Sequence, residues 1–267
     1  MSADNYWDYH ECRWVASLTQ SMGSGTVGAS TSFSPAYPGP SGSVSSRRRL
    51  TAAHGKEMAM FVQVFQGHVH DGAAMKRALD RWNAQLAPEA EGWLGSTSGV
   101  TDDGTFFGCA RFTSAQAARR NSDRAEQGEW WSSTSKCFSG EVDFHDCSEV
   151  VVVRGGGSDE AGFVRVIQGR AHDVARLREV STEFETRFPS LRPDLLGFTV
   201  ALHDDGDGAF TQVAYFTTEE AAREGERQEP PEDARQLLQE EMSLWQDVTY
   251  LDLRQPWLHS PARSGGG

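Results

Sequence analysis

The segment Phe61-Val-Gln-Val-Phe-Gln-Gly-His-Val-His-Asp71 returns 102 residues later as Phe163-Val-Arg-Val-Ile-Gln-Gly-Arg-Ala-His-Asp173. Later segments match in the same order: Gly92-Trp-Leu with Gly197-Phe-Thr, Asp102-Asp-Gly with Asp204-Asp-Gly, and Arg111-Phe-Thr-Ser with Tyr215-Phe-Thr-Thr. Self-similarity over such a length indicates a duplicated structural domain. We therefore expect two copies of one fold in the chain.

Each copy predicts the order strand, helix, strand, strand, helix, strand. Residues 61–66 read as a short strand, and Asp71 is placed to cap the helix that follows. Pro88 ends that helix, whose apolar face is formed by residues at helical spacing: Met75, Ala78, Leu79, Trp82 and Leu86. An Asp-Asp-Gly turn then joins two strands. A second helix is expected at about 114–138 and a last strand at 141–145, with counterparts at about 218–244 and 248–253.

The element order β-α-β-β-α-β is that of a ferredoxin-like unit, which covers one face of its sheet with helices and leaves the other bare. Two tandem units can cover both bare faces by packing sheet against sheet. The sequence thus predicts an α+β protein, an intramolecular α+β barrel. We expect a disordered Ser/Gly/Pro-rich tail over 1–57, a first unit over 58–150, a Gly-rich linker over 151–162, a second unit over 163–256 and a flexible tail over 257–267.

Charge and composition disfavour several classes of partner. The 267 residues carry a net charge of −13, which repels nucleic-acid backbones and anionic membranes. No apolar stretch approaches the roughly 20 residues of a membrane span. The four cysteines lack paired CxxC spacing and are too few for a disulfide framework. We expect a cytoplasmic protein that binds neither nucleic acid nor membrane.

The doubled element order, the Phe-Val-Gln-Val-Phe-Gln-Gly opening and the helix that carries residues 121–131 resemble the antibiotic-biosynthesis-monooxygenase-like group of dimeric α+β barrel proteins. The resemblance covers about residues 60–255 and implies that a fused tandem forms the barrel within one chain, as a monomer or homodimer. The group includes cofactor-independent oxygenases of phenolic polyketides, quinol oxygenases and haem-degrading enzymes. Its polyketide oxygenases are similar in having an asparagine and a tryptophan close together around the second helix.

Asn121 and Trp130 or Trp131 are the residues that match this pattern, although they lie farther apart than in the group. Haem-degrading members carry an asparagine on the first strand and a histidine after the tryptophan. Here the strand has Gln63, and residues 132–140 contain no histidine, so haem degradation is disfavoured. We expect no cofactor.

The stretch from Asn121 to Trp131 is the most unusual in the chain, and the second copy has neither its asparagine nor its tryptophans. An amide, a guanidinium and indole rings suit a planar aromatic ligand that bears oxygen. We take Asn121, Arg124 and Trp130 as catalytic candidates. The ligand-binding candidates are Gln127, Trp131 and Gln63. The alternative is structural: the tryptophans fill the core, while Asn121 and Arg124 form caps and ion pairs.

Histidines offer a further alternative, which we do not favour. His68 and His70 lie two residues apart and could combine with His145, Asp146 and Cys147 in a metal site. However, His70-Asp71 recurs as His172-Asp173, which a helix start explains better. We therefore predict no metal site.

The sequence favours a protein that binds a small aromatic molecule, with a cofactor-independent monooxygenase of a phenolic or quinol-like compound as the specific hypothesis. The competing hypothesis is a noncatalytic ligand-binding or scaffold protein of the same fold.

Overall fold

A computed structural model describes residues 7–8, 13–14, 60–187 and 191–261 of the chain. Most of residues 1–57, for which we predicted disorder, lies outside the described residues. The described part of this range forms two short strands, β1 (Trp7–Asp8) and β2 (Arg13–Trp14), which pair antiparallel. The chain divides into two units between residues 54 and 55, and the rest of the description concerns the second.

This unit contains two halves with the same order of strands and α-helices. The first consists of β3 (Phe61–His68), α1 (Gly72–Gln85), η1 (Ala87–Glu89), β4 (Trp93–Val100), β5 (Thr105–Phe112), α2 (Ala115–Ser122), α3 (Ala125–Thr134), η2 (Ser135–Cys137), β6 (Asp143–Cys147) and β7 (Glu149–Val153). The second consists of β8 (Phe163–Ala171), α4 (Val174–Arg187), β9 (Leu195–Leu202), β10 (Ala209–Phe216), α5 (Glu219–Arg227), α6 (Glu232–Ser243), β11 (Trp245–Leu253) and β12 (Trp257–His259).

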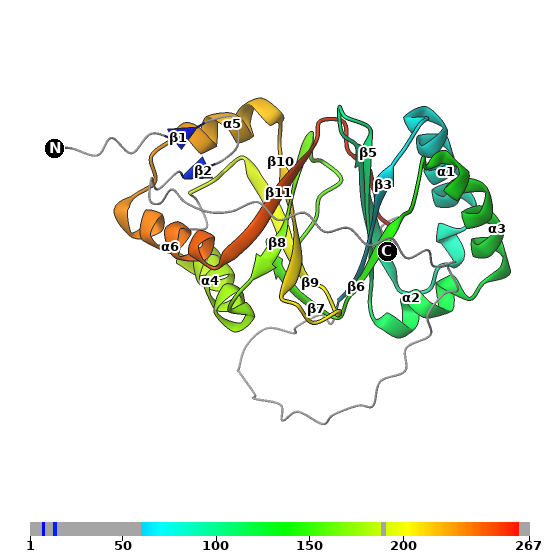
Figure 1. Ribbon diagram of the computed structural model, residues 1–267, viewed down its shortest axis with the longest axis horizontal. Helices are drawn as coiled ribbons and strands as arrows, with labels where there is room; N and C mark the ends of the chain where they lie inside the picture. The colour runs from blue at the N-terminus through cyan, green and yellow to red at the C-terminus, as the bar shows by residue number, and fades with distance from the viewer. Residues whose placement is uncertain (1–6, 9–12, 15–59, 188–190, 262–267) are drawn as a thin grey trace, which may run out of the picture. The chain divides into compact units, whose positions relative to one another are not determined.

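The strands form two five-stranded antiparallel sheets, in the orders β12-β4-β5-β3-β6 and β11-β8-β10-β9-β7. Figure 1 shows α1, α2 and α3 beside the first sheet and α4, α5 and α6 beside the second. The other faces of the sheets pack together, because Val62 and Val64 of β3 share one apolar cluster with Val164 and Val166 of β8. The predicted α+β fold with two sheets packed face to face is confirmed.

Each half contributes an edge strand to the sheet of the other half. Only Ser148 separates β6 from β7, yet β6 pairs in the first sheet and β7 pairs with β9 in the second. Likewise β12 follows β11 closely but pairs with β4. Residues 151–153, which we predicted as linker, therefore lie in β7, and residues 257–259, predicted as a flexible tail, form β12. The outer edges of β9 and β4 would otherwise carry unpaired backbone N–H and C=O groups. β7 and β12 provide hydrogen-bond partners for these groups.

The helix starts and turns agree with the local sequence signals. Asp71 accepts a 2.8 Å hydrogen bond from the backbone N–H of Ala74 at the start of α1, whose face toward the sheet buries Met75 and Ala78. The turn between β4 and β5 places Gly104 at φ 88°, a conformation that glycine adopts without strain. These observations confirm the predicted cap and hairpin.

The second helix of each copy is broken, where we expected one continuous helix. In the first half the backbone is extended at Arg124, between α2 and α3. In the second half Pro230 and Pro231 separate α5 from α6, because proline disfavours a helical residue before it.

The register of the sheets also corrects one match between the copies. Gly95 pairs with Arg111 after a bulge in β4, and Gly197 pairs with Tyr215 beside a bulge in β9. Gly197 is therefore the structural counterpart of Gly95, not of Gly92. The counterparts Arg111 and Tyr215 meet between the sheets, where Arg111 Nη1 donates to Tyr215 Oη at 2.9 Å.

Candidate functional site

The candidate residues from 121 to 131 lie on the helix side of the first sheet, at the junction of α2 and α3. Ser114 caps α2 by accepting from the backbone N–H of Ala117 at 3.1 Å, and α2 ends at Ser122. The extended backbone at Arg124 then turns the chain into α3. This bend brings the side chains of Asn121, Arg124 and Gln127 together.

A small polar network connects these three side chains with α1. Arg124 Nη1 donates to Asn121 Oδ1 at 3.2 Å, and Asn121 Nδ2 lies 3.5 Å from Gln127 Oε1. The same Gln127 oxygen accepts a 2.6 Å hydrogen bond from Trp82 Nε1. Asn121 is buried, whereas Arg124 and Gln127 are partly buried. Trp82 was predicted as a core residue, and its indole N–H is the signal that could have indicated a polar role.

Arg124 also ties the end of α1 to the start of α3. Its Nη1 donates to the carbonyl of Leu86 at 3.0 Å, and its Nη2 lies 3.3 Å from Glu89 Oε2. Part of its hydrogen-bonding capacity is therefore used within the protein, which is what the structural interpretation of this residue requires. The guanidinium carries five N–H donors, so the remaining donors can still bind an anionic oxygen.

The two adjacent tryptophans of α3 have different surroundings. Trp130 Nε1 donates to the carbonyl of Ala78 at 2.9 Å, and the Trp130 ring lies 6.4 Å from the ring of Trp82. Trp131 lies 5.3 Å from Phe144 and 6.2 Å from Phe65, measured between ring centroids. Trp130 thus adjoins the polar network, whereas Trp131 belongs to an aromatic cluster farther along the sheet.

Gln63 occupies the helix side of β3, but its amide is directed to the sheet edge. Gln63 Nε2 donates to Asp146 Oδ1 on the neighbouring strand β6 at 2.8 Å. Within the described residues no hydrogen bond joins Gln63 to Asn121, Arg124 or Gln127.

Trp93 adds an unpaired donor beside the network. Its ring lies 5.2 Å from the ring of Trp82, and the residue is 6% exposed. Among the described residues its buried Nε1 has no hydrogen-bond partner. A buried donor without an acceptor costs about 1–3 kcal/mol, so a ligand oxygen at this position would remove that cost.

The corresponding region of the second half is filled differently. By the positions of the helix caps, Ser114 and Thr218, the counterpart of Asn121 is Gly225. A Cβ atom on Gly225 would lie 2.5 Å from Arg192 Nε, so the guanidinium packs directly over this glycine. Arg192 in turn pairs with Asp194. Within the described residues of the second half, the amide, guanidinium and indole network of the first half is therefore not repeated.

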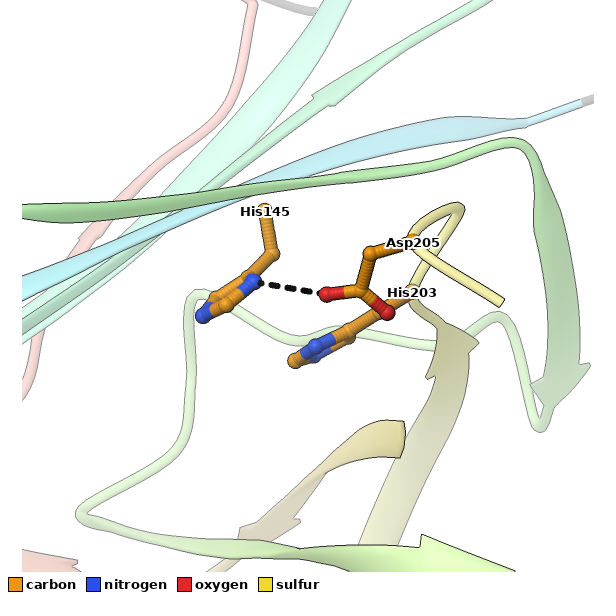
Figure 2. Close-up of side chains that lie close together, drawn as sticks. All are labelled: His145, His203 and Asp205. Atoms are coloured by element: carbon orange, nitrogen blue, oxygen red, sulfur yellow. Dashed lines mark ion pairs between the residues drawn. The ribbon is translucent and has the colours of Figure 1, made fainter. Parts of the chain in front are cut away.

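A second group of functional side chains lies where the two halves meet (Figure 2). His145 Nδ1 is 3.6 Å from Asp205 Oδ2, and the rings of His145 and His203 stack with centroids 4.1 Å apart. The structure brings His145 to these residues rather than to His68 and His70, which are exposed. Sequence reasoning missed this arrangement, because His203 and Asp205 lie about 60 residues from His145 in the other copy.

No protein-family profile and no curated protein match this chain. Solved structures do match over both halves. A "putative monooxygenase" from Fusobacterium nucleatum matches with a TM-score of 0.64 at 9% identity, over 77% of this chain and 96% of the other. A "putative monooxygenase" from Lactobacillus acidophilus NCFM matches with a TM-score of 0.60 at 12% identity, over 76% of this chain and 100% of the other.

An "anthrone oxidase-like protein" matches with a TM-score of 0.55 at 9% identity, over 78% of this chain and 95% of the other. At such low identity the likeness concerns the fold alone. The part of the chain described by the structure contains no helix both long and apolar enough to cross a membrane. The chain thus shares its predicted α+β barrel fold with these solved structures.

Proposed function

We propose that the first half binds a small aromatic molecule between α1, α2, α3 and the sheet, and that the protein is a cofactor-independent monooxygenase of a phenolic or quinol-like compound. The observation that carries the proposal is the unpaired, buried indole N–H of Trp93 beside the network of Trp82, Gln127, Asn121 and Arg124. A phenol oxygen can accept from the indole, and ring faces of Trp82 and Trp130 can pack against an aromatic substrate.

In the proposed reaction the substrate supplies all the electrons. Loss of a proton from the phenol gives an electron-rich anion, and donors from Arg124, Asn121 and Trp93 stabilise its negative oxygen. In a phenolic substrate that contains a ring methylene, such as an anthrone, the anion then reduces dioxygen: one oxygen atom replaces the two hydrogens of the methylene as a carbonyl, and the other leaves with these hydrogens as water. The likeness of fold to an anthrone oxidase-like protein is compatible with this substrate class.

The second candidate function is noncatalytic binding. It is favoured by the hydrogen bonds that Arg124 already donates to Asn121 and to the carbonyl of Leu86. In that case the network shapes a binding surface without changing the ligand. We further propose a cytoplasmic protein that acts as a monomer or homodimer. The free state of Cys109, Cys137 and Cys147 supports a reducing compartment.

Trp93→Phe tests the site, because it removes the N–H and keeps an aromatic ring. Trp245→Phe is the matched control, since the Nε1 of Trp245 is also buried and unpaired but lies among apolar side chains of the second half. We expect the affinity for phenolic ligands, followed by tryptophan fluorescence, to fall about fivefold to tenfold in Trp93→Phe and to stay unchanged in Trp245→Phe.

Oxygen consumption, measured with an electrode and a panel of hydroquinones and anthrones, separates the two functions. The monooxygenase hypothesis requires consumption by the wild-type protein and a lower rate in Trp93→Phe. Ligand binding without consumption would support the noncatalytic alternative. Equal behaviour of both variants in binding would overturn the proposed site.

A further inference from the structure

The junction of the two halves carries side chains that are suited to binding a metal. His145 lies on β6, and the strand register shows which way its side chain faces. His145 pairs with Val64 of β3, and Cys147 pairs with Val62. Val62 and Val64 belong to the apolar layer between the sheets. His145 is therefore directed toward the second half. His203 and Asp205 meet it from the turn between β9 and β10 (Figure 2).

Hydrogen bonds fix this turn against the first half. The backbone N–H of Asp204 donates to the carbonyl of Asp146 at 2.8 Å, and the carboxylate of Asp204 accepts from the backbone and the hydroxyl of Ser148 at 2.9 and 2.7 Å. The residues adjoining His145 and Asp205 in sequence are thus joined directly. The backbone holds the three side chains near one another without any contribution from an ion.

His203 has the orientation of a metal ligand. The buried hydroxyl of Thr211 lies 2.9 Å from His203 Nε2, which leaves Nδ1 available to a metal. Such a hydrogen bond to the second ring nitrogen is the usual support of a ligating histidine.

The spacing of the ligand atoms fits a shared ion after a small movement of side chains. One ligand atom from each of His145, His203 and Asp205 lies within 4.8 Å of the others. Ligands at about 2.0–2.1 Å from a tetrahedral ion lie about 3.3 Å apart, so rotations of the side chains must bring these atoms closer by at most about 1.5 Å. Asp205 is exposed, so its side chain can make this movement.

We propose that His145, His203 and Asp205 bind one divalent transition-metal ion, Zn²⁺ or a related ion, that links the two halves of the barrel. Two imidazoles and one carboxylate suit such ions, and three protein ligands leave an open position. The site lies on the opposite face of the first sheet from Gln63 and the candidate aromatic site. The inference is thus independent of the proposed oxygenase function.

The test uses the full-length protein, stripped with EDTA, dialysed and titrated with Zn²⁺ by calorimetry at neutral pH. We expect one tight site in the wild-type protein, and an affinity lower by roughly tenfold or more in His203→Ala and Asp205→Ala. Asp205→Ala is the safer variant, because its side chain is 54% exposed and its removal leaves the buried contacts unchanged. His70→Ala, at an exposed histidine of the first half, is the matched control and should bind like the wild type.

Two further measurements locate the ion. Bound Co²⁺ should give the visible absorption of a low-coordinate site with nitrogen ligands in the wild type and in His70→Ala, and lose it in His145→Ala. Zn²⁺ should also raise the melting temperature of the wild type more than that of Asp205→Ala, because an ion bound to both halves stabilises the folded state. Unchanged Zn²⁺ binding in Asp205→Ala and His203→Ala would overturn the proposal and leave His145 and Asp205 as an ordinary ion pair.

Discussion

Glu241 provides a quantitative test of the packing in the second half. It lies on α6, is 8% exposed, and accepts a 3.0 Å hydrogen bond from the hydroxyl of Ser181 on α4. Burial raises the pKa of Glu241 from 4.5 to about 7, and the hydrogen bond from Ser181 offsets this only in part. The perturbation is Glu241→Gln, which preserves shape and the acceptor oxygen but removes the titration.

The sign and magnitude of the effect follow from proton linkage. Between pH 4.5 and 7 the unfolded chain has lost the proton of Glu241, while the folded protein still holds it, so the free energy of unfolding decreases as the pH rises. A pKa difference of about 2.5 units corresponds to about 3 kcal/mol at roughly 1.4 kcal/mol per unit. The free energy of unfolding of Glu241→Gln does not decrease in this way. Near pH 8 it should therefore exceed that of the wild type by up to about 3 kcal/mol.

The assay is urea denaturation at several pH values from 5 to 8, followed by tryptophan fluorescence. The quantity of interest is the difference between variant and wild type at each pH, because the contributions of other groups, such as His203, cancel in it. Glu240→Gln is the control: a hydrogen bond from Arg176 lowers the pKa of the partly exposed Glu240, so that its contribution changes below pH 4.5, outside this window. A pH-independent difference between Glu241→Gln and the wild type would refute the reasoning.

Three further substitutions test the contact between the sheets, the first sheet and α3. Tyr215→Phe removes the hydroxyl that accepts from the buried Arg111, and should lower the free energy of unfolding by about 1–3 kcal/mol in urea denaturation; an unchanged value would mean that Arg111 finds another partner. Gly108→Ala places a Cβ atom against the ring of Phe65, closer than van der Waals contact allows, and should lower the free energy of unfolding by about 1–3 kcal/mol. Gly128→Ala, on α3 with open space around it, should instead stabilise the protein by about 0.5–1 kcal/mol, so an equal loss in both glycine variants would contradict the predicted crowding.

Much of the candidate site could be found from sequence, because part of it is local. Asn121, Arg124 and Gln127 are separated by three residues each, so a bend between two helices brings them together. Their partners are not local. Trp82 reaches Gln127 from α1, and the position of Gln63 on the sheet directs its amide to Asp146. Whether the donor of Trp93 finds an acceptor depends on how α1, α2 and the sheet pack, which no spacing in the sequence reveals.

The sequence alone determined the two copies, the order of their elements, the cap at Asp71 and the hairpin turns. These features depend on interactions between residues a few positions apart, which a local pattern records. Tertiary structure alone decided that β7 and β12 join the opposite sheets and that His145 meets His203 and Asp205. The N–H and C=O groups at the edge of a strand form hydrogen bonds with backbone groups of a neighbouring strand. Because backbone groups are nearly the same in every residue, the pattern of side chains does not specify which distant strand provides the partner.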